Sequence, residues 1–335
     1  MFATCSFIIS PWGKGELLYH NSEMATKNST AIEKNNDPNF NSGDNAAITA
    51  FWICGWRALE YRRGDAAAII DPYAERLMSN GGWSHFEKQG TKLSKLLNLG
   101  NLRNTVINRT KFYDSNIMKG VKNFGIRQTI IIGAGLDTRA FRLFQDYPDM
   151  HVIEIDHPNL FAYKEPRLEG LKPSCKRSIL SLDYDEVTEW DVRAREKFGF
   201  DPLKPTIFVL EGVTMYIPLE NELELYRKID ANAALNSVIT GCSQHVFNSP
   251  RDVGYGITWY NTDRKAMKEV LKYWGVSLTA TNPFGIGVAM TMMGIKRDKP
   301  YESDSHFLSK IFPFIRFELR ESSPWLCNSA DCFLW

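Results

Sequence analysis

The residues best suited to chemistry in this 335-residue chain come directly after buried, β-branched runs. Gly133-Ala134-Gly135 follows Ile130–Ile132, and Asp156 ends the next run about 20 residues later, a separation typical of nucleotide-binding folds. Glycines at a strand end let a ligand approach the backbone, and the acid can accept hydrogen bonds from both hydroxyls of a ribose. The pattern predicts a nucleotide-like ligand; an ordinary tight turn and a solvated carboxylate are the alternatives.

The turn also indicates which nucleotide to expect. Dinucleotide-binding turns usually keep a third glycine so that the pyrophosphate can lie at the following helix N-terminus, but Thr138 stands in that place and Asp137 precedes it. A carboxylate there repels phosphate, whereas S-adenosylmethionine has no phosphate and presents a sulfonium and an ammonium cation. We therefore expect S-adenosylmethionine as the cofactor and methyl transfer as the reaction. An NAD-dependent oxidoreductase is a rival class.

A third candidate, Glu211, ends the apolar run Ile207–Leu210. The carboxyl ends of parallel strands share one edge of the sheet, so Glu211 is expected near Gly133 and Asp156. A helix N-cap is its alternative role.

The elements that must position these residues alternate between strands and helices. β-branched runs recur at a spacing typical of βαβ units, and runs that are apolar throughout indicate strands covered on both faces. The pattern predicts an α/β, doubly wound, mostly parallel sheet, with residues 314–319 and 330–335 as an antiparallel edge hairpin. The expected strands are Thr129–Ile132, His151–Ile155, Ser178–Leu180, Thr206–Leu210 and Ser237–Thr240.

Helical spacing and stop signals predict the helices. They are expected from Asp44 to Tyr61, from Tyr73 to Met78, from Leu102 to Lys119 and from Asp263 to Trp274. Residues 1–44 are expected to form a flexible leader, because residues 21–44 are rich in polar side chains. Residues 45–335 are expected to form a single methyltransferase domain, with a helical cap (45–120), a cofactor-binding core (121–245) and a substrate-side and edge-strand region (246–335).

Composition excludes several classes of protein. Lys and Arg (40) nearly balance Asp and Glu (39), which argues against nucleic acid as a partner. The six cysteines form no CxxC pair, so no metal site is expected, and a reducing compartment, the cytoplasm, is favoured. No apolar stretch approaches the roughly 20 residues that cross a bilayer, so no membrane partner is expected.

At this point the chain resembles the leucine carboxyl methyltransferases and their bacterial and fungal small-molecule O-methyltransferase relatives. The resemblance implies a class I methyltransferase fold, with a Rossmann-like, seven-stranded sheet and an N-terminal helical cap. The matching stretches are Trp56-Arg57-Ala58, Asp71-Pro72-Tyr73, Asn108-Arg109-Thr110, Gly133 to Leu143, Glu154 to Pro158, Leu182-Asp183 and Glu211 to Pro218.

The resemblance also implies roles for the cofactor residues. Arg109 would pair with the carboxylate of S-adenosylmethionine, and Glu211 would reach its ammonium group. Gly133-Ala134-Gly135 would border the amino acid portion, Asp156 the ribose, and Leu182-Asp183 the adenine.

The expected acceptor is a carboxylate, of a small-molecule acid or a protein C-terminus, because a carboxylate is already a nucleophile at neutral pH. Catalysis would then consist mainly of positioning, with Tyr216, Arg63 and Tyr73 as candidates and Arg62 beside them. His157 is expected to be structural. A hydroxyl acceptor, for which His245 is the candidate base, and a non-catalytic S-adenosylmethionine-binding protein are the alternatives.

Overall fold

A computed structural model describes residues 45–78, 82, 83, 86, 102–182, 184–246, 250–252, 258–281 and 287–300. All of them belong to one compact unit that begins at Asp37. The predicted leader 1–44 and the predicted hairpin strands 314–319 and 330–335 lie outside the described residues.

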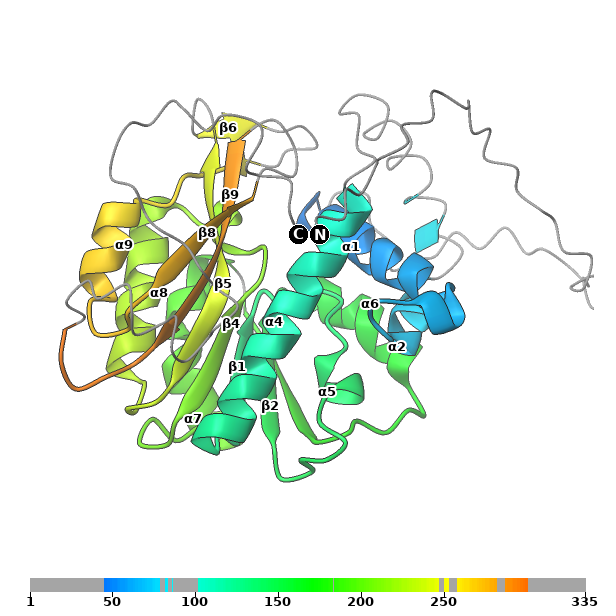
Figure 1. Cartoon of the computed structure of the whole chain (residues 1–335), viewed down its shortest axis with the longest axis horizontal. Helices are drawn as coiled ribbons and strands as arrows, with labels where there is room; N and C mark the ends of the chain where they lie inside the picture. Colours follow the sequence, from blue (N-terminus) through cyan, green and yellow to red (C-terminus); the bar gives the residue numbers. More distant parts are fainter. Residues whose placement is uncertain are drawn as a thin grey trace, which may run out of the picture. The chain divides into compact units, whose positions relative to one another are not determined.

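The unit is built on a seven-stranded sheet (Figure 1). Its order is β3-β2-β1-β4-β5-β9-β8; β1 to β5 run parallel, and β9 runs antiparallel to both β5 and β8. The strands are β1 (Gln128–Ile132), β2 (His151–Asp156), β3 (Lys176–Ser181), β4 (Thr206–Leu210), β5 (Val238–Val246), β8 (Ser277–Thr281) and β9 (Gly287–Ile295). The strand order reverses direction between β1 and β4, and ligands bind at such switch points.

The antiparallel part of the sheet is formed by β8 and β9, two strands that the sequence pattern does not predict. β9 reads GVAMTMMGI, in which glycine, alanine and methionine replace the β-branched run that marks the other strands. Its nine residues pair with the whole of β5. A short two-stranded sheet, β6 (Arg251–Asp252) with β7 (Thr258–Trp259), lies outside the main sheet.

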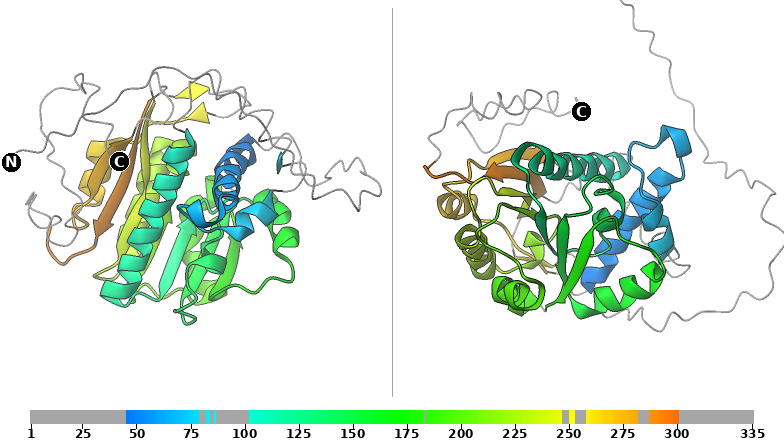
Figure 2. Two further views of the ribbon diagram at one scale, coloured as in Figure 1. Left: turned by 45° about the vertical axis from the view of Figure 1, so that its right-hand side comes forward. Right: turned by 90° about the horizontal axis from the view of Figure 1, so that it is seen from below.

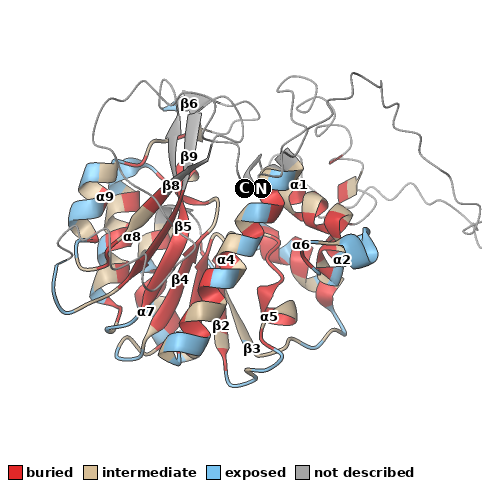
Figure 3. Cartoon of the chain, in the orientation of Figure 1, coloured by how far each residue is buried: buried red, intermediate tan, exposed pale blue. Residues whose placement is uncertain are grey.

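Helices cover both faces of the sheet (Figure 2), as the doubly wound prediction requires. Ile131 of β1 packs into a core with α4 (Leu102–Phe124), α5 (Arg139–Arg142) and α6 (Pro158–Leu168). Its neighbours Ile130 and Ile132 pack into a second core with α7 (Trp190–Phe198), α8 (Leu219–Ala231) and α9 (Arg264–Val270). β1 and β4 are therefore buried throughout their length, as Figure 3 shows for β4.

Two N-terminal helices pack against the α4–α6 side. They are α1 (Asn45–Tyr61) and α2 (Pro72–Leu77), and α2 starts where Asp71 accepts a hydrogen bond from the N–H of Ala74 at 3.0 Å. α1 lies against the turn after β1, because a Cβ on Gly135 would stand 3.4 Å from the Cβ of Ala50. The short 3-10 helices are η1 (Gly64–Ala66), η2 (Tyr184–Glu189) and η3 (Thr214–Tyr216). Within the described part of the chain, no helix combines the length and apolar character needed to span a membrane.

Candidate functional site

The turn after β1 is held against the end of β2. The N–H groups of Gly133 and Ala134 donate to the carbonyl of Ile155 at 2.9 and 3.0 Å. Gly133 has φ +71°, and a Cβ there would stand 2.5 Å from the Cβ of Val213, so only glycine fits both the conformation and the space.

Asp156 completes this corner. Its Oδ2 accepts the N–H of Gly135 at 2.5 Å, and its Oδ1 accepts the N–H of His157 at 2.7 Å. The residue is 7% exposed, and burial raises the pKa of its carboxyl although the two N–H donors lower it. None of the ion pairs between described residues includes Asp156. A buried carboxylate of this kind, with lone pairs to spare, suits neutral donors such as hydroxyl groups.

Arg109 and Glu211, which were assigned to opposite charges of one ligand, contact each other. Arg109 lies on α4 and its Nε is 3.1 Å from Oε1 of Glu211, which follows β4. Among the described residues, the two Nη nitrogens of Arg109 have no hydrogen-bond partner, and its side chain is 17% exposed. Arg109 therefore keeps a planar pair of donors for a carboxylate.

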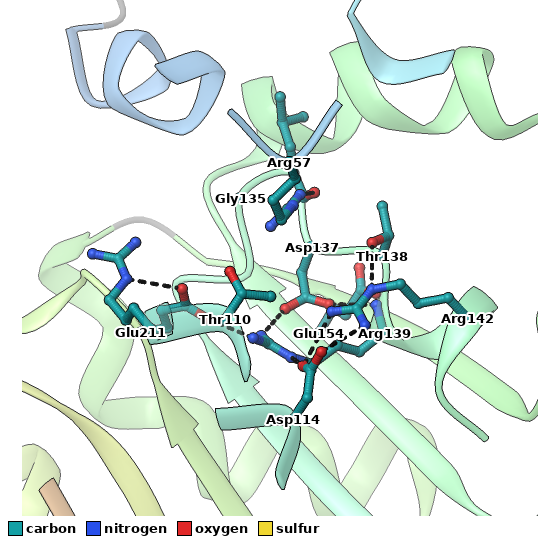
Figure 4. Close-up of polar contacts among 12 residues, drawn as sticks. Arg57, Thr110, Asp114, Gly135, Asp137, Thr138, Arg139, Arg142, Glu154 and Glu211 are labelled. Carbon is teal, nitrogen blue, oxygen red and sulfur yellow. Dashed lines mark hydrogen bonds and ion pairs between the residues drawn. The ribbon is translucent and has the colours of Figure 1, made fainter. Parts of the chain in front are cut away.

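A buried ion cluster connects this pair to the glycine turn (Figure 4). Arg139 of α5 contacts Oδ1 of Asp114 through Nε at 2.7 Å and Oε2 of Glu211 through Nη2 at 2.7 Å, and its Nη1 pairs with Asp137. Arg142 binds Asp114 as well, at 2.6 and 3.0 Å.

The cluster continues to α1 through Asp71. Asp71 accepts a hydrogen bond from the hydroxyl of Thr138 at 2.7 Å and lies 3.1 Å from Nε of Arg57. Arg57 in turn donates to the carbonyl of Leu136 at 2.5 Å. The described pairs contain as many cations as anions, so the buried cluster carries no net charge. The cations are Arg57, Arg109, Arg139 and Arg142, and the anions are Asp71, Asp114, Asp137 and Glu211.

Asp137 has a different role from the one predicted for it. Its Oδ1 accepts the N–H of Arg139 at 2.6 Å, and its Oδ2 pairs with the same guanidinium. Burial alone would raise the pKa of Asp137, but Arg139 and other cations lower it to about 2. Arg139 therefore balances the charge of Asp137, a pairing that the sequence argument did not include.

The remaining predicted residues fall into several groups. Leu182 is buried just after β3, where its N–H donates to the carbonyl of Asp156 at 3.0 Å, whereas Asp183 lies outside the described residues. Tyr216 donates its hydroxyl to Thr49 of α1 at 2.9 Å and packs edge-on against Trp259, with ring centres 6.5 Å apart. Tyr216 thus links the loop after β4 to the helix that covers the glycine turn.

The other positioning candidates contact parts of the N-terminal helices and α5. Arg63 pairs with Glu60 at 2.8 Å, and the ring of Tyr73 lies 5.3 Å from that of Phe141. Arg62 binds Glu75 through two nitrogens, at 2.5 and 2.8 Å. None of these contacts reaches Asp156 or the Arg109–Glu211 pair, so the part of these residues in positioning an acceptor stays a prediction.

Two histidines were also given roles from the sequence. His157 caps α6, where its Nδ1 accepts the N–H of Asn159 at 3.2 Å, which agrees with the structural role expected for it. His245 lies in β5, and its side chain is outside what the structure describes. Where the side chains are described, no group of three or more His, Cys, Asp and Glu could hold a metal ion.

Sequence reasoning assigned no role to Arg139, Asp114 or Arg142. Arg139 and Asp114 are 25 residues apart, and nothing in either local sequence shows that α4 and α5 meet. The one available signal was Asp137-Thr138-Arg139 directly after the glycine turn, where a charged pair at a buried helix start requires a partner.

Residues 50–230 match the sequence profile described as leucine carboxyl methyltransferase. The chain belongs to this family. The matched stretch of this leucine carboxyl methyltransferase family member runs from α1 into α8 and includes Arg109, the glycine turn, Asp156 and Glu211. β5, β8 and β9 lie beyond it.

Individual relatives agree with the family assignment. A Mycolicibacterium smegmatis protein, provisionally named an S-adenosyl-L-methionine-dependent methyltransferase, is 32% identical over 197 residues, which are 56% of this chain and 64% of the relative. A Mycobacteroides abscessus protein with the same provisional name is 30% identical, over 64% of this chain and 72% of its own. The match thus spans just under two thirds of the first relative's length.

A solved structure supports the fold. The crystal structure of a DUF574 family protein from Streptomyces avermitilis superimposes with a TM-score of 0.51 at 13% identity, over 67% of this chain and 95% of that one. At this identity the likeness concerns the fold alone.

Proposed function

We propose that this family member is an S-adenosylmethionine-dependent O-methyltransferase that acts on a carboxylate. The observation that carries the proposal is the grouping of three features at one edge of the sheet. A glycine turn lies between a buried carboxylate, Asp156, and a cation–anion pair, Arg109 with Glu211. The groups match a ribose on one side and a zwitterionic amino acid on the other. The family and the names of the relatives support the same cofactor.

Each residue would bind a particular part of the cofactor. Asp156 would accept hydrogen bonds from the ribose hydroxyls, while Leu182 and Asp183 would border the adenine. The Nη nitrogens of Arg109 would hold the carboxylate as a fork, and Glu211 would accept the ammonium group. The bound cofactor supplies an electrophilic methyl group on a sulfonium centre. Gly212, with φ +73°, gives the chain a tight turn directly after Glu211.

The surroundings of Glu211 favour an acceptor that arrives already ionised. Burial raises the pKa of Tyr216 and that of Cys242, so neither side chain is ready to remove a proton at neutral pH. A carboxylate acceptor has no proton to lose and needs only alignment and exclusion of water. Such an acceptor could belong to a small-molecule acid or a protein C-terminus, and the C-terminal third outside the family match favours the small molecule.

Calorimetric titration with S-adenosylhomocysteine, beside NAD as the control ligand, tests the cofactor. We expect micromolar-range or tighter binding of S-adenosylhomocysteine and none of NAD. The reverse preference would make the chain an oxidoreductase. Transfer of a labelled methyl group from S-adenosylmethionine to acids in a cell extract then distinguishes an enzyme from a protein that only binds the cofactor.

The acceptor is tested by pH. Single-turnover methyl transfer to a carboxylate should be nearly flat between roughly pH 6.5 and 8.5, because an acid with a pKa near 4 is fully ionised throughout. A rate that climbs close to tenfold per pH unit contradicts a carboxylate and indicates a hydroxyl acceptor, with His245 as the first residue to mutate.

A further inference from the structure

One residue of the ion cluster has no assigned part in the proposed function. Arg139 is 1% exposed, yet it carries a full charge and reaches three separate elements. It contacts Asp114 on α4, Asp137 in the turn after β1, and Glu211 after β4. The same three elements carry residues of the proposed cofactor site: Arg109 on α4, the glycine turn after β1, and Glu211 after β4.

We propose that Arg139 is a positioning residue, which holds the carboxylate of Glu211 as a fixed anion so that it can receive the cofactor's ammonium group. This inference rests on the proposed function and adds a residue to it. Arg139 itself is not placed to touch the ligand, since each of its three guanidinium nitrogens already contacts a different carboxylate. Arg109, with two Nη nitrogens still available, is the arginine suited to the ligand.

The geometry separates the two arginines in a second way. Arg109 meets Oε1 of Glu211 and Arg139 meets Oε2, so each oxygen has its own cation. When Arg109 turns its fork toward the carboxylate of the cofactor, the contact from Arg139 at 2.7 Å still fixes the plane of Glu211. The remaining lone pairs of Oε1 then point to the side where the ammonium group is expected.

The charge of Glu211 depends on the same contact. Burial raises the pKa of a carboxyl in this position, but Arg139 first and Arg109 second lower it below its usual value. Among the described residues, the ionisable groups that interact with Glu211 from the surrounding elements are Arg57, Arg109, Tyr113, Asp137, Arg139 and Cys242. Of these, Arg139 is the only cation apart from Arg109 that contacts the carboxylate directly. Without Arg139, the pKa of Glu211 should therefore rise.

Arg142 provides a matched control. It is also buried and binds the same acid, Asp114, but it makes no contact with Glu211. Removing Arg139 alone would leave Asp137 without its ion-pair partner, and breaking a buried pair is strongly destabilising. The test therefore compares Arg139→Gln/Asp137→Asn with Arg142→Gln/Asp114→Asn, because each double variant removes one arginine together with an acid that it contacts, and so one positive and one negative charge from the cluster.

The readout is the dissociation constant of S-adenosylhomocysteine, measured by calorimetry at pH 6, 7 and 8, after circular dichroism has shown that each protein is folded. The wild type and the Arg142 variant should have parallel pH profiles. The Arg139 variant should lose about a further tenfold in affinity between pH 8 and pH 6, as Glu211 takes up a proton. That additional loss should vanish when Glu211→Gln is added, since glutamine does not titrate.

The outcomes separate the two ideas. If the wild type binds and the Arg139 variant follows the same pH profile, Arg139 only stabilises the fold and the positioning role is wrong. If the wild type does not bind S-adenosylhomocysteine at any pH, the proposed function itself fails. If the Arg139 variant does not fold, Arg139→Lys gives the same test: an ammonium cannot reach three carboxylates, and loss of its contact with Glu211 should again produce the pH-dependent weakening.

Discussion

Glu222 is a buried carboxyl on α8 that the proposed function does not use, and its titration should be measurable in the stability of the protein. Its side chain is fully buried. Oε1 accepts hydrogen bonds from the hydroxyls of Thr262 at 2.7 Å and Tyr226 at 3.2 Å. Burial raises the pKa of Glu222 from 4.5 to about 7, although the hydrogen bonds from Thr262, Tyr226 and Thr214 oppose the rise.

The sign and size of the effect follow from this rise. The folded protein keeps the proton of Glu222 up to about pH 7, whereas the unfolded chain releases it above about pH 4.5. The contribution of Glu222 to the free energy of unfolding is therefore fully present below pH 4.5 and is lost as the pH rises to 7. Each tenfold difference in proton affinity is worth about 1.4 kcal/mol, so the ionised form costs about 3 kcal/mol at pH 8.

Glu222→Gln should remove this cost, because an amide is neutral at every pH and its oxygen can accept the same two hydroxyls. Urea denaturation of both proteins at pH 5, 6, 7 and 8 measures the difference. We expect similar stabilities at pH 5 and a variant that is more stable by about 2–3 kcal/mol at pH 8. Glu220→Gln, an exposed change on the same turn, is the control and should leave the profile unchanged. A Glu222→Gln variant whose stability runs parallel to the wild type from pH 5 to 8 would refute the reasoning.

Three further predictions concern the proposed cofactor site. Asp156→Ala should weaken S-adenosylhomocysteine by about 1.5–3 kcal/mol, because two ribose hydroxyls lose a charged acceptor; unchanged calorimetric affinity in a folded variant removes Asp156 from the site. Arg109→Lys should bind the same ligand about tenfold more weakly or worse, since an ammonium cannot form a bidentate pair, and equal affinity would show that a point charge suffices. Gly133→Ala should cost about 2 kcal/mol or more in denaturant unfolding, because its φ of +71° and Val213 both oppose a Cβ; wild-type stability would contradict the turn geometry.

The sequence predicts the central strands well because they are buried on both faces. Residues 206–210 form β4 with the expected limits, β1, β2 and β3 differ from the expected ranges by one or two residues at their ends, and β5 runs to Val246 instead of ending at Thr240. The pattern fails at β8 and β9: β9 is rich in glycine, alanine and methionine, and β8 is a five-residue strand, SLTAT, with a single large apolar residue. Their place in the sheet depends on the pairing of β9 with β5 and of β8 with β9, which local sequence does not encode.

The candidate site could also be predicted only in part. Gly133, Asp156 and Glu211 could be placed at one edge because parallel strands end together, and the structure brings them to that edge. The cluster around Arg139 could not be predicted, since its members meet only after α4 and α5 have packed on the sheet. Charges were visible in the sequence, but their partners were not.

The order of the strands along the chain also determines how long each strand waits for its partner during synthesis. β5 ends at Val246, whereas β9, which pairs with its whole length and is also the only described partner of β8 in the sheet, begins at Gly287. At translation rates of about 5–20 residues per second, β9 follows β5 by roughly 2–8 seconds. During that interval the nascent chain can complete β1 to β4 but exposes the free edge of β5, to which other nascent chains can adhere. Chaperone demand should therefore peak late in synthesis, after β5 has left the ribosome and before β9 has followed it.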